Sequence, residues 1–247
     1  MKLVLPLIVL LIAFPCTSPA ESAERFAAAR QELVGQIENH VQATRHYIDK
    51  QNLDAKVMAA MAAVPRHLFV PLELQEFAYE NRPLAIGYGQ TISQPYIVAL
   101  MTDLLAVTPT DKVLEVGTGS LYQAAVLAWL GAEVYTLEII EPLAKEAEER
   151  RRRLDIGKVH TKTGDGYYGW PKHAPFDAII VTAAASHVPP PLIGQLKAGG
   201  RMIIPVGSGF NTQQLLLITK ESDDRLTTRQ ILPVVFVPLT GGSKTSP

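Results

Sequence analysis

Hydrophobic and polar positions follow a helical rhythm in the N-terminal part of the chain. From Glu24 to about Lys50, apolar residues recur at roughly helical spacing, which predicts one long helix. Two shorter helices are expected over Lys56 to Ala63 and over Leu72 to Tyr79. We expect these N-terminal helices to pack on, or cap, a sheet that the rest of the chain forms.

The remainder of the chain alternates between apolar runs and helical stretches. A helix is expected from Pro95 to Leu105, strands near residues 113, 134, 158, 178, 201, 214 and 231, and further helices near 121, 142 and 190. This alternation is typical of a doubly wound, mostly parallel α/β sheet. The last two strands, Gln213 to Thr219 and Thr228 to Val237, are joined by a polar turn and should form an antiparallel hairpin at one edge.

Residues 111 to 138 read as a strand, a glycine turn, a helix and a second strand that ends in an acid. Gly117 and Gly119 make the turn, and Gly131 ends the helix. Glu138 closes the second strand, 19 residues after Gly119. In nucleotide-binding α/β folds, an acid about 20 residues beyond the glycines accepts hydrogen bonds from ribose hydroxyls.

The glycine turn lacks the features of two common phosphate-binding loops. A dinucleotide fingerprint would need glycine at Tyr122, and no P-loop sequence occurs in the chain. What remains is Glu115, two glycines and Glu138, which is the pattern of Rossmann-like S-adenosylmethionine-dependent methyltransferases of class I. Glu115 suits the ammonium of that cofactor, and Glu138 suits its ribose diol. A ligand-free unit, whose glycines only make the turn, stays open as an alternative.

Seven collinear stretches resemble the protein-L-isoaspartate (D-aspartate) O-methyltransferase family, from about Val64 to the C-terminus. They are VPRHLFVP (64 to 71), AYENRPLAIGYGQTISQPYIVALM (78 to 101), VLEVGTGSLYQAAVLA (113 to 128), VYTLEIIEPLA (134 to 144), GDGYYGWPKHAPFDAIIVTAA (164 to 184), LKAGGRMIIPVG (196 to 207) and FVPLTG (236 to 241). The GYGQTISQPYIVA block is specific to this family among methyltransferases.

The resemblance implies methyl transfer from S-adenosylmethionine to the α-carboxylate of L-isoaspartyl residues in damaged proteins and peptides. A carboxylate is already nucleophilic at neutral pH, so alignment and desolvation are expected to supply the acceleration without a general base. Two alternatives stay open: a secreted binding protein without turnover on the same scaffold, and a carboxyl methyltransferase with a different acceptor.

The family's functional positions map onto this chain residue by residue. The resemblance implies that Ser93 lies at the methyl-accepting carboxylate and positions it; the alternative for Ser93 is a helix N-cap before Pro95. The positions implied for the cofactor are Thr91 and Ile92 in the pocket wall, Glu115, Gly117, Thr118 and Gly119 at the methionine end, Glu138 at the ribose, Asp165 and Gly166 at the adenine end, and Thr240 as a closing residue.

The glycine loop departs from the family pattern at one position. The family's loop usually reads G-T-G-S-G-Y, and here Leu121 replaces the last glycine. We expect Leu121 in the first helical turn, where its backbone angles suit a side chain, although the leucine could crowd the ligand or the neighbouring strand. Ile139 stands where arginine is frequent in the family, and little effect is expected from it.

Composition and charge exclude other chemistry. The net charge of −1 gives no steering toward nucleic acid. The six histidines show no metal-ligand spacing, and no metal site is expected. The arginines from Arg150 to Arg153 end a helix, where cations are favourable, and are expected to form a solvated face.

The first residues have the features of a Sec-type signal peptide. Lys2 is followed by an apolar stretch from Leu3 to Phe14, and Ser18-Pro19-Ala20 forms a cleavage site. Cleavage after Ala20 would leave residues 21 to 247 as one monomeric domain without cysteine, periplasmic or secreted and with no stable membrane association. A cytoplasmic fraction is kept as an alternative, because S-adenosylmethionine is made in the cytosol.

Overall fold

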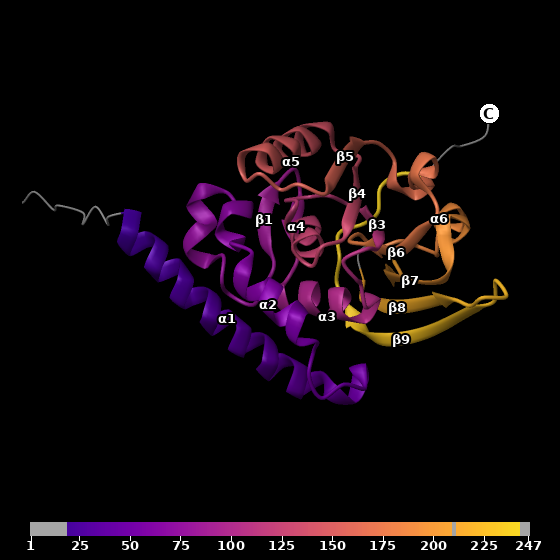
Figure 1. The fold of residues 1–247 in the computed structure, drawn as a ribbon, viewed down its shortest axis with the longest axis horizontal. Coiled ribbons are helices and arrows are strands. Elements are labelled where there is room, and N and C mark those ends of the chain that lie inside the picture. The colour runs from indigo at the N-terminus through magenta and orange to yellow at the C-terminus, as the bar shows by residue number, and fades with distance from the viewer. Residues whose placement is uncertain (1–18, 209–210, 243–247) are drawn as a thin grey trace, which may run out of the picture.

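The computed structural model describes residues 19–208 and 211–242. The chain begins with α1 (Pro19–Ile48) and α2 (Ala55–Ala63), followed by two 3-10 helices, η1 (Arg66–Phe69) and η2 (Leu72–Phe77). In Figure 1, α1 is the long indigo helix that runs beside the rest of the molecule. The predicted long helix and second helix are confirmed, and the third is a shorter 3-10 helix. Within the described ranges, no helix has both the length and the apolar character needed to span a bilayer.

One seven-stranded sheet forms the centre of the fold, in the order β5-β4-β3-β6-β7-β8-β9. Its strands are β3 (Lys112–Val116), β4 (Glu133–Glu138), β5 (Val159–Thr163), β6 (Phe176–Val181), β7 (Leu196–Val206), β8 (Gln213–Lys220) and β9 (Leu226–Val234). The neighbouring strands β5, β4, β3, β6 and β7 pair in parallel. Strand β8 pairs antiparallel with both β7 and β9. The predicted doubly wound sheet with its C-terminal hairpin is confirmed.

The order of the strands places a ligand site. The chain starts in the middle of the sheet at β3, winds outward through β4 and β5, and then returns to β6 on the other side of β3. Ligands in such open sheets bind beyond the carboxyl ends of the strands, at the point where the winding reverses. That point lies at the ends of β3, β4 and β6.

Helices cover both faces of this sheet. They are α3 (Pro95–Leu105), α4 (Tyr122–Trp129), α5 (Glu141–Arg153) and α6 (Pro190–Gln195), each near its predicted position. Because successive strand residues point to opposite faces, Val113 joins one hydrophobic core and Leu114 joins the other. All residues of α3 are buried, since it packs against α1, α2 and the sheet.

A short hairpin, β1 (Leu84–Gly87) and β2 (Gln90–Ile92), was absent from the prediction. Its strands are too short for an alternating pattern to stand out in the sequence. The turn between them has positive φ at three successive residues, with 90° at Gly87, 53° at Tyr88 and 72° at Gly89. The family-specific GYGQTIS block therefore builds a tight turn and the strand that leads to Ser93.

Candidate functional site

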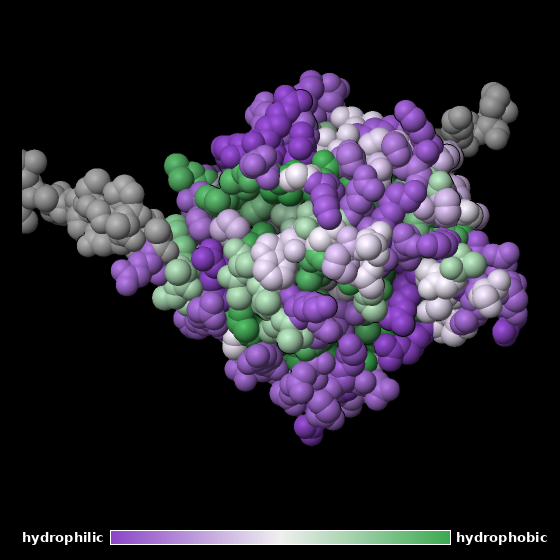
Figure 2. Space-filling model, in the orientation of Figure 1, coloured by the Kyte–Doolittle hydropathy of each residue, from purple (hydrophilic) through white to green (hydrophobic). Residues whose placement is uncertain are grey.

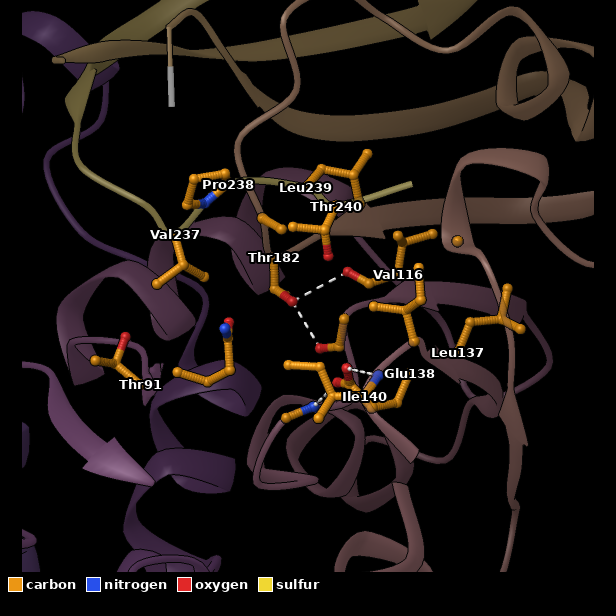
Figure 3. Close-up of a pocket in the computed structure, with 16 residues that line it drawn as sticks. Thr91, Val116, Leu137, Glu138, Ile140, Thr182, Val237, Pro238, Leu239 and Thr240 are labelled. Atoms are coloured by element: carbon orange, nitrogen blue, oxygen red, sulfur yellow. Dashed lines mark hydrogen bonds between the residues drawn. The ribbon is translucent and has the colours of Figure 1, made fainter. Parts of the chain in front are cut away.

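A cavity lies at the carboxyl ends of β3, β4 and β6, at the reversal of the winding (Figure 3). We call it the glycine cavity, because the loop after β3 forms its floor. Its lining comprises Gln90, Thr91, Val116, Gly117, Gly119, Leu137, Glu138, Ile139, Ile140, Gly166, Thr182, Ala183 and residues 237–240. Apolar side chains, one carboxylate and exposed loop backbone thus face one space.

The two loop glycines are required for different reasons. Gly117 has φ of +97°, and a Cβ there would lie 2.5 Å from Thr182 Oγ1. The Thr182 hydroxyl lies 2.7 Å from the Gly117 carbonyl oxygen and 3.0 Å from that of Val116, as the dashed lines in Figure 3 show. Gly119 has φ of +50°, and a Cβ there would meet only Ile86 Cδ1, at 3.5 Å. The loop is therefore packed tightly against Thr182, just after β6, at Gly117, and more loosely against Ile86 at Gly119.

Leu121 does not lie in the first turn of α4, so the expectation about its backbone was wrong. It is the N-cap residue, with φ of 73° in the left-handed region, which bulky residues rarely adopt. Its side chain is fully buried in the core that contains α3 and α4, and it does not line the glycine cavity. The left-handed backbone explains why the family usually has glycine at this position. The leucine side chain does not crowd the glycine cavity.

Glu138 lines the glycine cavity with its carboxylate held by two backbone amides. Gly119 N–H donates to Oε2 at 2.9 Å, and Ile140 N–H donates to Oε1 at 3.0 Å. A carboxylate has about four lone-pair sites, so both oxygens retain acceptor capacity. The arrangement fixes one orientation of the carboxylate and ties the end of β4 to the glycine loop, as a ribose acceptor would require.

Glu115 and Thr118 lie beneath the loop, outside the lining of the glycine cavity. Thr136 Oγ1 donates to Glu115 Oε2 at 2.5 Å and lies 2.7 Å from Thr118 Oγ1. Complete burial raises the pKa of Glu115 to about 8, against the opposing hydrogen bond from Thr136. At neutral pH this side chain is largely neutral. The structure does not bring it to the position expected for a partner of the cofactor ammonium.

The adenine-end residues differ in their roles. Gly166 lines the glycine cavity, and a Cβ there would lie 2.4 Å from Val116 Cγ1, so only glycine fits. Asp165 is outside the lining. Its Oδ1 accepts from Tyr167 N–H at 2.9 Å and its Oδ2 from Gly242 N–H at 2.8 Å. Asp165 therefore holds the C-terminal segment in place.

That C-terminal segment, residues 235–242, crosses the glycine cavity as a strap. Ala184 N–H donates to the Val237 carbonyl and Leu239 N–H donates to the Ala184 carbonyl, both at 2.8 Å. Phe236 N–H donates to the side chain of buried Gln213 at 2.8 Å. In Figure 3 the labelled strap residues lie on the opposite side of the cavity from Glu138. Thr240, expected as a closing residue, lies on this strap.

A second cavity adjoins the first, and we call it the apolar cavity. Its lining contains His40, Thr44 and Tyr47 of α1, then Pro83, Ser93, Gln94, Tyr96, Ile97, Thr212 and residues 232–236. Thr91, Thr182 and Val237 border both cavities. Ser93 lines only the apolar cavity, whereas Ile92 is buried in the core and lines neither. The two cavities therefore meet two residues from Ser93.

Ser93 does not cap α3, so the alternative for this residue was wrong. The N-cap of α3 is Gln94, which makes no capping bond with its side chain. Instead Asn81 accepts from Tyr96 N–H at 2.9 Å, and its carbonyl accepts from Gln94 Nε2 at 2.9 Å. The Ser93 hydroxyl is therefore not used to cap α3, and Ser93 lines the apolar cavity.

Sequence reasoning missed the contribution of α1 and of residues 237–239 to the two cavities. The first forms a wall of the apolar cavity and the second covers the glycine cavity. Both are distant from the glycine loop along the chain, and neither carries a charged motif. The FVPLTG stretch was the only signal that could have identified the strap.

Comparisons with known proteins agree on one family. The profile of the family "Protein-L-isoaspartate(D-aspartate) O-methyltransferase" matches residues 39–244. The chain is 58% identical over 237 residues to protein-L-isoaspartate O-methyltransferase 2 of Syntrophobacter fumaroxidans, covering 96% of each chain. It is 62% identical over 209 residues to the protein of that name from Polaromonas sp., covering 85% of this chain and 99% of the other.

Solved structures give the same result. A protein-L-isoaspartate O-methyltransferase superposes with a TM-score of 0.74 at 28% identity, over 86% of this chain and 66% of the other. A Plasmodium falciparum protein described as a putative member, in complex with S-adenosyl-L-homocysteine, superposes with a TM-score of 0.67 at 27% identity, over 83% and 96%. The range matched by the family profile, residues 39–244, includes the whole sheet and the residues that line both cavities.

Proposed function

The chain belongs to the protein-L-isoaspartate(D-aspartate) O-methyltransferase family, and from this premise we propose how its two cavities divide the reaction. The protein is an enzyme that uses S-adenosylmethionine to methylate the α-carboxylate of L-isoaspartyl residues in damaged proteins. We assign the cofactor to the glycine cavity and the isoaspartyl residue to the apolar cavity. The observation that carries this assignment is the junction of the two cavities at Thr91, Thr182 and Val237.

The glycine cavity fits the cofactor in its polar and apolar parts. Glu138, oriented by two amides, would accept the ribose hydroxyls, while the backbone of Gly119 lines the cavity beside it. Val116, Leu137 and the backbone of Gly166 would enclose the base. Bound S-adenosylmethionine supplies an electrophilic methyl group, which leaves its sulfonium sulfur for a carboxylate oxygen of the acceptor, so the products are a methyl ester and S-adenosylhomocysteine.

On the acceptor side, the proposed task of the protein is alignment. An ionised carboxylate is already the nucleophile, so we assign no proton transfer to His40, which lines the apolar cavity. The Ser93 hydroxyl would donate to one carboxylate oxygen and direct the other toward the junction. The strap and α1 would exclude water, which strengthens that hydrogen bond and lowers the cost of desolvating the nucleophile during reaction.

Replacing Ser93 by alanine tests this assignment. Removing a hydrogen bond to a charged group costs about 1.5–3 kcal/mol, so kcat/KM for an isoaspartyl peptide should fall by about tenfold or more, with KM for S-adenosylmethionine unchanged. The measurement is steady-state methyl transfer, with exposed Ser222→Ala in the β8–β9 turn as the matched control. Equal kinetics for Ser93→Ala and Ser222→Ala would remove Ser93 from the site.

We further propose that residues 1–20 direct export and that residues 21–247 act as one monomeric domain outside the cytoplasm. The support is the sequence pattern; residues 1–18 of that segment lie outside the described residues, and α1 begins at Pro19. The intact mass of the protein, measured in separate cell fractions, tests the export proposal. Light scattering of the purified protein tests the monomer proposal. A full-length chain confined to the cytosol would overturn the export proposal. A mass in solution twice that of one chain would overturn the monomer proposal.

A further inference from the structure

Arg66 is a fully buried cation next to the acceptor segment. It begins η1 and is completely shielded from solvent. Its Nε donates to the Ala78 carbonyl at 2.9 Å, and its Nη2 donates to the Ser93 carbonyl at 2.8 Å. The guanidinium also lies over the ring of Tyr122, with 4.9 Å from Cζ to the centroid. One side chain therefore links η1, the loop after η2 and the backbone of Ser93.

The charge of Arg66 has no counter-charge within the described part of the chain. No carboxylate there forms an ion pair with it, and its hydrogen-bond acceptors are neutral carbonyls. Its Nη1 is buried and has no hydrogen-bond partner among the described residues. Burial lowers the pKa of the guanidinium to about 10, which still leaves it charged at neutral pH.

Two other buried ionisable side chains in the described part of the chain avoid an unpaired charge, each in its own way. Asp103 pairs with Lys50 and also accepts from the Asp54 amide. Burial raises the pKa of Glu115, so this side chain is largely uncharged at neutral pH. A buried charge without a partner is strongly unfavourable, so an unpaired arginine needs a reason beyond its carbonyl contacts. The substrate of this enzyme is an anion, and Ser93 lines the cavity proposed to receive it.

We infer that Arg66 is a positioning residue for the acceptor carboxylate, acting through Ser93. The guanidinium would hold the Ser93 carbonyl and so direct the hydroxyl into the apolar cavity. It would also supply the positive field that the incoming carboxylate completes, which is strong in a desolvated site. This inference rests on the proposed role of Ser93 at the acceptor.

A purely structural role makes a different forecast. If Arg66 only ties three segments together, its loss weakens every peptide equally, whatever charge the peptide carries. If Arg66 recognises charge, its loss weakens the carboxylate selectively. A peptide with an L-isoaspartyl residue and its twin with an L-isoasparaginyl carboxamide differ only in that charge. Comparing their affinities therefore separates the two roles.

The experiment is calorimetric titration of both peptides into the full protein with S-adenosylhomocysteine present, for wild type, Arg66→Met and Arg66→Gln. We expect the neutral variants to lose about tenfold or more in affinity for the isoaspartyl peptide and less than about threefold for the carboxamide. Two neutral variants are used so that one may misfold without ending the test, and circular dichroism reports folding. Arg66→Lys, which keeps the charge, should restore most of the preference for the carboxylate.

Arg201→Gln is the matched control, because Arg201 also donates to a backbone carbonyl, but to that of Leu104, which lines neither cavity, whereas Arg66 donates to that of Ser93. It should keep the wild-type preference. Equal losses for both peptides in a folded neutral variant would overturn the role of Arg66 while leaving the acceptor assignment intact. No preference for the carboxylate in the wild type would overturn the acceptor assignment itself.

Discussion

At the scale of single residues, conformation and burial oppose each other at Leu121. Its backbone is left-handed, with φ of 73°, and its side chain is fully buried. Left-handed geometry costs a residue with a Cβ about 1–2 kcal/mol, whereas removing a buried leucine side chain costs about 2–5 kcal/mol. The burial of the side chain is the larger effect, which accounts for a leucine at a position that suits glycine.

Two substitutions at this residue separate the effects. Leu121→Ala loses the side chain and keeps the strain, whereas Leu121→Gly loses the side chain and relieves the strain. Both variants should be less stable than wild type in urea unfolding. The free energy of unfolding of the glycine variant should be higher than that of the alanine variant by about 1 kcal/mol. This reverses the usual order of alanine and glycine at a helix. The usual order would show that the backbone at Leu121 is not left-handed in solution.

Glu115 gives a pH dependence of stability whose sign follows from its burial. Its pKa in the folded protein is raised to about 8, whereas the unfolded chain ionises near about 4.3. Between these values the folded state binds the extra proton, so stability from this group falls as pH rises, by up to about 1.4 kcal/mol per pH unit. Above about pH 8 the contribution is constant.

The Glu115→Gln variant lacks this titration. Its free energy of unfolding relative to wild type should therefore rise between about pH 5 and about pH 8. Urea unfolding across that range measures the difference, and exposed Glu73→Gln serves as the control that should follow wild type. A constant difference between Glu115→Gln and wild type across the range would show that Glu115 is ionised in the folded protein.

At the scale of elements, the β1–β2 hairpin and α5 meet beside the glycine cavity. Tyr88, at the tip of the hairpin, donates its hydroxyl to Glu146 Oε1 of α5 at 2.8 Å. Gln90 of β2 and Ile140, just before α5, both line the cavity. The hairpin thus bridges one side of the cavity with a contact that is exposed and weak enough to open.

Loss of that contact should speed the release of the cofactor product. Tyr88→Phe removes one exposed hydrogen bond, so S-adenosylhomocysteine should dissociate faster, by about two- to tenfold. Stopped-flow displacement measures the rate, and Tyr168→Phe, an exposed tyrosine outside both cavities, is the control. An unchanged dissociation rate would mean that the hairpin does not control exit.

Element positions were largely predictable, because long apolar runs and terminal glycines mark them. All seven strands of the sheet and the helix from Pro95 to Leu105 were found where the sequence placed them. The β1–β2 hairpin was not, since strands of three and four residues carry no period. Residue roles were less predictable: Glu115 fits the motif, yet tertiary packing buries it beneath the loop, and Leu121 shows its strain only in three dimensions.

At the scale of the whole molecule, the two cavities depend on segments from both ends of the described chain. His40, Thr44 and Tyr47 of α1 and the strap after β9 close around Ser93 and the glycine loop. The outer face of α5 is hydrophilic at the top of Figure 2, and Arg152 and Arg153 are exposed as predicted. Arg150 and Arg151 are only half-exposed, so the predicted solvated face is confirmed for two of its four arginines. Both cavities are thus built from segments that are distant along the chain.

The central claim is that the glycine cavity delivers a methyl group to an isoaspartyl carboxylate in the apolar cavity. Methyl transfer by the purified protein to an isoaspartyl peptide and to its normal aspartyl twin tests it most directly, with binding of S-adenosylhomocysteine measured on the same sample. We expect binding of S-adenosylhomocysteine and methylation of the isoaspartyl peptide alone. Binding without methylation of either peptide, or equal methylation of both, would contradict the claim.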